Sequence, residues 1–345
     1  MLVGHDETMT ERAVHIRKGR RDFLTSKRDN DKSSTVRCYE SITRDFVEYL
    51  EENGIERTDS IDGFLISQWK IKRTEEDNVS PATIHNNTKH IRVFIRWLEA
   101  SEMLDSGLAD KIQIPNVNEG QLRSDDTVNP DTYESIISHL ELYEYATRLH
   151  VITKFLWHTG CRISGLIALD LKDYDAQQNI VKFRNRRQLG TALKNGEKSE
   201  RNVSISDEMK GLLNDYIEGR RCDVRDEYDR QPLFTTEHGR MARQRVYKNF
   251  TAISRPCVYA NNCPHGREIN ECEAARKKKQ AFSCPSSESL HPIRRGALTY
   301  HLNQGWPIEK VSEKCDVTEN VLREHYDTRT HEDKRQGRRQ YVDKL

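Results

Sequence analysis

The stretch HTGCRISGLIAL, residues 158–169, contains the end of one helix and the start of another. The apolar segment that precedes it, TRLHVITKFLW, has the composition of a buried helix, and Gly160 then ends it because glycine readily takes the left-handed backbone of a helix terminus. Arg162 follows two residues later, at the start of the next helical segment. The stretch therefore predicts an arginine held at a junction between two helices.

Helical periodicity extends on both sides of this junction. In the first third, Val36, Tyr39, Ile42, Phe46 and Tyr49 follow helical spacing. A later helix is expected to begin with Ser80 as its cap and Pro81 in its first turn, and to bury the apolar side chains Ile84, Ile91, Ile95 and Leu98. The polar segment 118–128 then separates a helical domain, residues 1–117, from a second domain, residues 129–345.

The second domain is expected to restart as a helix at Asn129 and Pro130. Only IVKFR, residues 180–184, and NVSIS, residues 202–206, have the composition of strands. The Asn-Gly pair at 195–196 between them indicates a hairpin turn. The predicted fold class is mainly α with a small antiparallel β-sheet.

Composition restricts the kind of partner. The 345-residue chain has a formal net charge of +1, yet KFRNRRQLG (182–190) and RMARQRVYKNFTAISR (240–255) are basic without a single acid. A surface that binds nucleic acid requires such a local excess of positive charge. The N-terminus has no apolar signal segment, and no apolar run is long enough to cross a bilayer. We therefore expect a cytoplasmic protein whose thiols stay reduced and which has no membrane partner.

Five side chains in four stretches suit attack on a phosphodiester without a catalytic metal. They are Arg162, Lys194, His291, Arg294 and Tyr326. Arginine forks bind phosphate oxygens and stabilise the charge of the transition state. A tyrosine hydroxyl becomes a nucleophile when a cationic site and a nearby base activate it, and a lysine on a hairpin can protonate a departing hydroxyl.

The order of these stretches resembles the tyrosine recombinases of the phage-integrase family. TGCRISGLIAL resembles the first arginine box, LKNGEKSERNVSI the hairpin with the catalytic lysine, HPIRRG the H-x-x-R box, and VLREHYDTR the nucleophile box. The resemblance implies a helical core-binding domain, a recombinase catalytic domain, double-stranded DNA as the partner, and a homo-tetramer on paired sites. It implies no catalytic cofactor. A C-terminal segment would be passed to a neighbouring subunit; THEDKRQGRRQYVDKL has a suitable length and polarity for this, and equally for a frayed tail.

The chain departs from the family pattern at two positions. Gly165 stands where the family usually has an acid, and Val317 where it has a histidine or tryptophan. Either the site tolerates these losses, or Asp316 or His325 fills part of the missing role. The charged surroundings of Tyr326 suit DNA better than a hydrophobic core.

Two of the assigned roles have rival residues. Lys198 competes with Lys194 as the lysine, and Arg295 competes with Arg294 as the arginine of the H-x-x-R box.

Four of the eight cysteines lie within residues 257–284, a segment that looks like an insertion in the family pattern. Cys257, Cys263, Cys272 and Cys284, with His265 as an alternative ligand, indicate structural zinc. The competing interpretation is unrelated thiols in a surface insertion.

Two groups of basic residues are candidate DNA contacts. They are Lys89 and Arg92 in the first domain, and Arg243, Arg245 and Lys248 in the second. For any one of them a solvated helical face is an equal explanation. The expected function is a site-specific recombinase that works through a 3′-phosphotyrosyl intermediate. The alternatives are a type IB topoisomerase-like nicking and closing enzyme, and a non-catalytic, zinc-stabilised DNA-binding protein.

Overall fold

The computed structural model describes residues 12–31, 33–118 and 126–327, together with Arg335, Arg339 and Val342. The chain divides into two compact units, Met1–Asp125 and Asp126–Leu345, which are described separately. This division falls within the segment 118–128 expected as a linker, of which residues 119–125 lie outside the described part. Most of the C-terminal segment expected to reach a neighbouring subunit also lies outside it.

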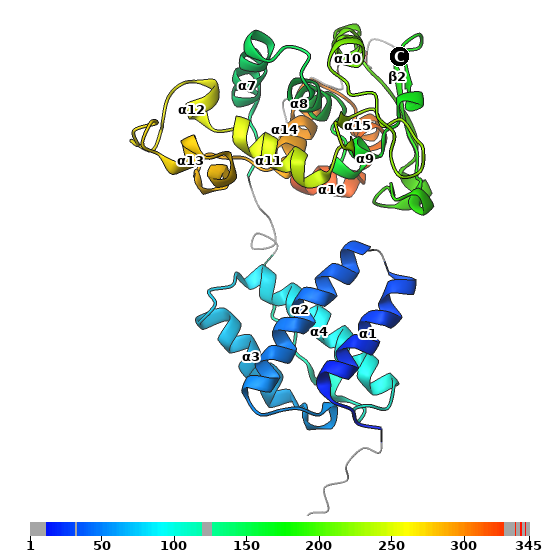
Figure 1. Ribbon diagram of the computed structural model, residues 1–345, viewed down its shortest axis with the longest axis vertical. Coiled ribbons are helices and arrows are strands. Elements are labelled where there is room, and N and C mark those ends of the chain that lie inside the picture. Colours follow the sequence, from blue (N-terminus) through cyan, green and yellow to red (C-terminus); the bar gives the residue numbers. More distant parts are fainter. Residues whose placement is uncertain are drawn as a thin grey trace, which may run out of the picture. The chain divides into compact units, whose positions relative to one another are not determined.

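The first unit is a bundle of helices (Figure 1). Its helices are α1 (Ile16–Asn30), α2 (Ser33–Glu52), the 3₁₀ helix η1 (Thr58–Ser60), α3 (Gly63–Glu75), α4 (Pro81–Ala100) and α5 (Leu108–Lys111). As predicted, α4 begins at Pro81, and the Ser80 hydroxyl accepts a hydrogen bond from the Thr83 amide at 3.3 Å. The four apolar residues predicted to face inward on α4 are all buried, and Ile91, Ile95 and Leu98 lie in a core that also holds Phe23 and Trp69.

The second unit is also mainly helical. Its α-helices are α7 (Pro130–Tyr143), α8 (Arg148–Thr159), α9 (Ile163–Ala168), α10 (Asp207–Gly219), α11 (Arg243–Ile253), α12 (Pro256–Tyr259), α13 (Glu273–Arg276), α14 (Leu290–Asn303), α15 (Ile308–Cys315) and α16 (Glu319–His325). Its 3₁₀ helices are η2 (Leu171–Asp173), η3 (Arg187–Leu189), η4 (Gly196–Ser199) and η5 (Lys278–Ser283). The predicted cap of α7 is confirmed, because the Asn129 side chain accepts from the Thr132 amide at 2.8 Å.

A small antiparallel sheet has the order β1-β2-β3, formed by Tyr174–Asp175, Ile180–Phe183 and Arg201–Ser204. The two predicted strands, β2 and β3, pair from Ile180 opposite Ser204 to Phe183 opposite Arg201. A second sheet joins β4 (Thr235–Thr236) to β5 (Gly239–Arg240). The sequence therefore missed β1, β4 and β5, since pairs of two residues are too short to show an alternating pattern.

The turn between β2 and β3 differs from the prediction. Asn195 and Gly196 do not close a tight hairpin; Asn195 instead caps the 3₁₀ helix η4, within a long excursion between the strands. Arg186 pairs with Thr191 in an isolated bridge near the base of this excursion. The excursion carries Lys194 and Ser199, and we call residues 184–200 the lysine loop.

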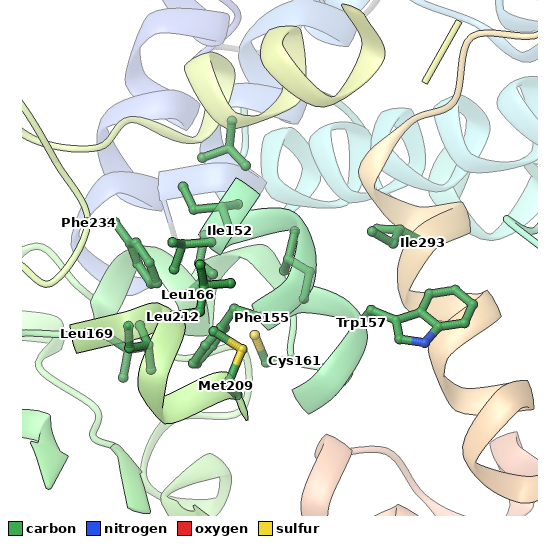
Figure 2. Packing of buried hydrophobic residues seen from close by; sticks show 14 of the residues in the cluster. Ile152, Phe155, Trp157, Cys161, Leu166, Leu169, Met209, Leu212, Phe234 and Ile293 are labelled. Atoms are coloured by element: carbon green, nitrogen blue, oxygen red, sulfur yellow. The ribbon is translucent and has the colours of Figure 1, made fainter. Parts of the chain in front are cut away.

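Helix α8 runs through the middle of the second unit's core. Phe155 and Leu156 are buried, and α10 packs onto the same core through Met209 and Leu212 (Figure 2). Since nearly every face of α8 is covered, its C-terminus has a fixed position relative to the helices around it. No helix in the described ranges is both long and apolar enough to cross a membrane.

Candidate active site

Arg162 lies where the sequence predicted, between two helices. Gly160 ends α8 in the left-handed conformation with a φ of 57°, and Arg162 is the N-cap of α9. A Cβ atom at Gly160 would lie 2.7 Å from the Cys315 sulfur and 3.0 Å from a Leu298 methyl. Glycine is therefore required here by backbone conformation and by close packing against α14 and α15.

Arg294 lies on α14 and is almost fully buried, at 6% exposure. Its guanidinium donates to the Gly160 carbonyl at 2.6 Å and to the Asp316 carbonyl at 3.4 Å. Burial, followed by the positive charge of Arg162, lowers the pKa of Arg294. The two arginines are therefore close enough to repel each other, and an anion placed between them would relieve that repulsion.

Gly296 allows α14 to approach the rest of the core. A Cβ atom at this position would lie 2.0 Å from the Val128 carbonyl oxygen and 2.7 Å from the Trp157 ring. The Val128 amide in turn donates to the Pro292 carbonyl at 3.2 Å. The helix that carries His291 and Arg294 is thus fixed to the segment before α7 and to α8.

His291 lies at the start of α14, with a side chain that solvent can reach. Partial desolvation lowers its pKa below 6.5, and the positive charges of Arg295, Arg294, Lys194 and Arg162 lower it further. Positive charges at Arg162, at Lys194 of the lysine loop and at two arginines of α14 therefore all act on this imidazole. A histidine in such a field is neutral near neutral pH and can accept a proton.

The positive charge around His291 bears on the two roles for which the sequence offered two candidate residues each. The positive charge of Lys194 is one of those that lower the pKa of His291. Arg294 and Arg295 both reach the site: Arg294 from the buried side, and Arg295 with its guanidinium 5.8 Å from the centre of the Tyr326 ring.

A buried ionic network holds the lysine loop against the domain. It joins Arg186, Arg230 and Arg240 to Asp170, Asp173 and Asp226. Arg230 also donates to the Leu189 carbonyl at 2.7 Å and to the Thr191 hydroxyl at 2.8 Å. Three positive charges face three negative ones, so the cluster is balanced and anchors the loop that carries Lys194. The sequence analysis did not predict this network, because its members come from separate segments.

Tyr326 follows α16 and is its C-cap. Its side chain is buried, at 8% exposure, in a hydrophobic cluster with Leu298, Cys315 and Leu322. The charged surroundings of Tyr326 were expected to suit DNA better than a hydrophobic core, but its side chain packs in one, because α14 and α15 supply an apolar face that the local sequence does not reveal. The Tyr326 hydroxyl is nevertheless close enough to the Arg294 guanidinium to act on the pKa of Arg294.

The two departures from the family pattern have a structural explanation. Gly165 is buried, and a Cβ atom there would lie 3.2 Å from the Phe183 ring, so a longer side chain has no room. Val317 packs partly buried against the cluster that holds Tyr326. Asp316, one of the two residues expected to compensate, contacts Arg162 directly. The other, His325, lies beside Tyr326 with its ring edge-on to it.

The four clustered cysteines line one cavity, together with His265. Burial raises the pKa of Cys257, and a backbone amide at Ala275, followed by Arg267, lowers that of Cys272. Among the described residues, no three His, Cys, Asp or Glu side chains lie close enough together to hold a metal ion. The thiols thus face a common space without forming a ligand set.

The candidate DNA contacts differ in exposure. Lys89 on α4 is exposed, as are Arg243, Arg245 and Lys248 on α11. Arg92 is half-buried and donates to the Ile112 carbonyl, so its guanidinium already has a structural partner within the first unit.

Comparison with known proteins decides the family. The model of the phage integrase family matches residues 126–316. The chain belongs to the phage integrase family. Among curated members, tyrosine recombinase XerA of Saccharolobus solfataricus is 25% identical over 198 residues, which cover 55% of this chain and 60% of XerA. Tyrosine recombinase XerD of Oceanobacillus iheyensis is 24% identical over 224 residues, which cover 62% of this chain and 69% of XerD. The chain thus spans about 60% of the length of XerA.

Solved integrases share the fold. The Tn1549 transposon integrase in complex with a circular intermediate DNA matches with a TM-score of 0.67 at 16% identity, covering 94% of this chain and 99% of that one. A lambda integrase dimer bound to a core site matches with a TM-score of 0.64 at 12% identity, covering 92% of this chain and 79% of that one. These likenesses support the predicted fold class, mainly α with a small antiparallel sheet.

Proposed function

We propose that this protein is a site-specific DNA recombinase that cuts and rejoins DNA through a 3′-phosphotyrosyl intermediate. The observation that carries the proposal is the convergence of Arg162, Lys194, Arg294 and Arg295 on His291, with Tyr326 beside the two neighbouring arginines. Positive charge of this density favours a phosphate at its centre. Family membership and the DNA-bound state of the similar integrases support the same conclusion.

In the proposed reaction, the Tyr326 oxygen attacks the scissile phosphorus and its proton passes to His291, which is neutral because its pKa is lowered. The bond between phosphorus and the 5′ oxygen breaks, and Lys194 protonates that oxygen. Arg162 and Arg294 stabilise the negative charge of the transition state. A 5′-hydroxyl of the partner duplex then attacks the phosphotyrosine and releases Tyr326, so that the phosphodiester count is conserved.

Duplex DNA is the proposed partner. Arg243, Arg245 and Lys248 form an exposed basic face on α11, and Lys89 offers a further cation on the first unit. Such residues contact phosphates and thereby position the protein without reading sequence. We further propose a homo-tetramer on paired sites and a cytoplasmic, DNA-associated protein. Sedimentation of the protein on a duplex that carries two sites, with and without residues 330–345, tests the tetramer.

A trapping experiment tests the reaction. A set of overlapping nicked duplexes that covers the DNA on both sides of the gene is incubated with the protein. Each duplex has its nick just 3′ of a different phosphate. Cleavage at that phosphate frees a short fragment with a 5′-hydroxyl, which dissociates and leaves the covalent adduct trapped. Wild type should form a covalent adduct that survives detergent on at least one duplex, and Tyr326→Phe should form none. Failure of wild type on every duplex would overturn the enzyme proposal, and an adduct with Tyr326→Phe would overturn the role of Tyr326.

Strand transfer separates recombination from nicking and closing. Two intact duplexes of different lengths, both carrying the sequence that was captured, are incubated together with the protein. A recombinase should yield duplexes of recombinant length, whereas an enzyme that only recloses each duplex should return the two original lengths.

We also propose that Cys257, Cys263, Cys272 and Cys284 bind structural zinc, with His265 as the alternative fourth ligand. Their shared cavity and the soft thiolate donors support this, although the side chains must move closer together to bind one ion. Zinc would tie the insertion together without taking part in the reaction. Metal analysis of the purified protein should find about one zinc per chain, lost in Cys257→Ser and Cys284→Ser and retained in Cys222→Ser; a wild type without zinc would end the proposal.

A further inference from the structure

Asp316 stands at the centre of the site without belonging to the proposed set of reacting groups. It is the C-cap of α15 and immediately precedes Val317 and the N-cap Thr318 of α16, the helix that ends at Tyr326. Its side chain is 16% exposed. The carboxylate is thus largely withdrawn from water, where a charge is retained only with partners of opposite charge and hydrogen-bond donors.

The partners of Asp316 come from three separate parts of the site. Its Oδ2 atom accepts a hydrogen bond from Nη1 of Arg162, and also one from the Ser199 hydroxyl of the lysine loop at 2.8 Å. Its backbone carbonyl accepts from Nη2 of Arg294 at 3.4 Å. One residue therefore links both arginines to the loop that carries Lys194.

The backbone of Asp316 is in an unfavourable conformation for an aspartate. Its φ of 52° and ψ of 63° lie in the left-handed region, where glycine is the most readily accommodated residue. A glycine here would form the same helix end with less strain. The contacts of the carboxylate with Arg162 and Ser199 offset this cost.

Other parts of Arg162 remain suited to a phosphate. Arginine carries five N–H donors in a rigid plane, and Asp316 accepts from Nη1. A carboxylate on one edge orients the plane and leaves donors on its other edges for substrate oxygens. An acidic residue at position 165, one turn further along α9, could not take this role, because a Cβ atom there would lie 3.2 Å from the Phe183 ring.

We propose that Asp316 is a positioning residue: its carboxylate orients the Arg162 guanidinium for the scissile phosphate and couples it, through Ser199, to the lysine loop. The inference rests on the proposed function and deepens it. Asp316 does not contact DNA in this scheme, and it acts on the rate of the covalent step through the orientation of Arg162.

Three substitutions separate positioning from folding. Asp316→Gly removes the carboxylate and its ion pair with Arg162, but it also relieves the left-handed backbone, which offsets part of the lost stability; the variant should stay folded, and its melting temperature checks this. Asp316→Asn keeps an oxygen acceptor and tolerates the same backbone while losing the charge. Ser199→Ala removes the link between Asp316 and the lysine loop, together with the hydrogen bond that the Ser199 hydroxyl accepts from the Asn195 amide at 3.3 Å.

The experiment uses the nicked duplex that wild type captures and measures the single-turnover rate of adduct formation beside the binding affinity for the same duplex. Asp316→Gly should lower the rate at least about tenfold while binding stays equal or tightens, because a negative charge near DNA has gone. The rates of adduct formation by Asp316→Asn and Ser199→Ala should lie between those of Asp316→Gly and wild type.

Two outcomes would overturn the inference. A rate for Asp316→Gly within about twofold of wild type would show that the carboxylate does not position Arg162, and a faster rate would show that it competes with the phosphate instead. Both outcomes require that wild type forms the adduct. If wild type forms none on any duplex, the proposed function itself is overturned and this inference with it.

Discussion

The Arg294 guanidinium donates a 2.6 Å hydrogen bond to the carbonyl oxygen of Gly160, although the two residues are separated by 134 positions. The glycine that ends α8 and the arginine of α14 are thereby part of one structural unit. Because Arg162 follows Gly160 by two residues, this bond also sets the distance between the two arginines of the candidate site. The site is consequently sensitive to changes in helix packing far from any substrate.

Gly296 offers a test of that sensitivity. Gly296→Ala would place a methyl group 2.0 Å from the Val128 carbonyl oxygen, so α14 must shift or the fold must open. We expect a loss of about 2–4 kcal/mol of unfolding free energy, measured by urea denaturation.

Gly211 provides the matched control for this substitution. It also lies within a helix, and a Cβ atom there meets nothing within 4 Å. Gly211→Ala should stabilise the protein by up to about 1 kcal/mol, since alanine is the better helix former. Equal effects of the two substitutions would contradict the assigned packing of α14.

The pH dependence of cleavage should report the environment of His291. Partial burial, and then Arg295 and the other cations, lower the pKa of its imidazole below 6.5. Neutral imidazole is the form that accepts a proton, so the rate should fall on the acid side only below pH 6.5. A single-turnover pH profile, together with an NMR titration of the histidines, measures this.

Arg295→Ala should move the acid limb of the profile upward, because it removes one of the charges that disfavour protonation of His291. Arg323→Ala is the control: Arg323 is an exposed arginine on α16 that pairs with Glu319. Its profile should match that of wild type. A wild-type limb at or above pH 6.5 would show that the cations do not act on His291.

Asp226 should contribute to stability in a manner that depends on pH. Burial disfavours its ionised form, but hydrogen bonds from Arg240 and Arg230 outweigh that effect and hold the pKa of Asp226 far below 3.8. Since the folded-state pKa is the lower one, this stabilisation is present above about pH 4 and disappears as the pH falls through the folded-state value.

Asp226→Asn should therefore cost about 3 kcal/mol of unfolding free energy at pH 7 and make stability less dependent on pH below 4. Asp229→Asn is the control, because Asp229 is 83% exposed and pairs only with Arg225 across the surface; it should change stability by less than about 0.5 kcal/mol. Urea titrations at several pH values measure both. A similar small loss for Asp226→Asn would contradict the role of the ionic network.

The basic face of α11 should govern non-specific DNA affinity. Arg243→Ala and Lys248→Ala should each weaken binding to an arbitrary duplex, and should reduce the slope of log affinity against log salt by about one. Fluorescence anisotropy at several salt concentrations measures both quantities.

Arg225→Ala serves as the control for charge alone, since Arg225 is 55% exposed and pairs with Asp229. An equal effect of all three substitutions would indicate a general charge effect and contradict a DNA face on α11. Arg92→Ala should instead lower stability, because the Arg92 guanidinium donates to the Ile112 carbonyl.

Short-range patterns in the chain were sufficient to predict several features. The caps at Ser80 and Asn129, the helix end at Gly160, the two longer strands and the shared helix of His291 and Arg294 all follow from a few neighbouring residues. Predictions that depended on the wider surroundings of a residue were less successful. The Asn195–Gly196 pair begins a 3₁₀ helix instead of closing a hairpin, because the lysine loop is held at its base by Arg186 and Thr191.

The sequence by itself determined the helices, their glycine ends, and the order in which the two arginines, the lysine, the histidine and the tyrosine follow one another. These properties depend on backbone preference and hydrophobic period, which act over a few residues. Only the tertiary structure decided that Tyr326 is buried against α14 and α15, and that Asp316 reaches Arg162 across 154 positions. Such contacts depend on how whole helices pack together, and that packing results from many weak interactions spread along the chain.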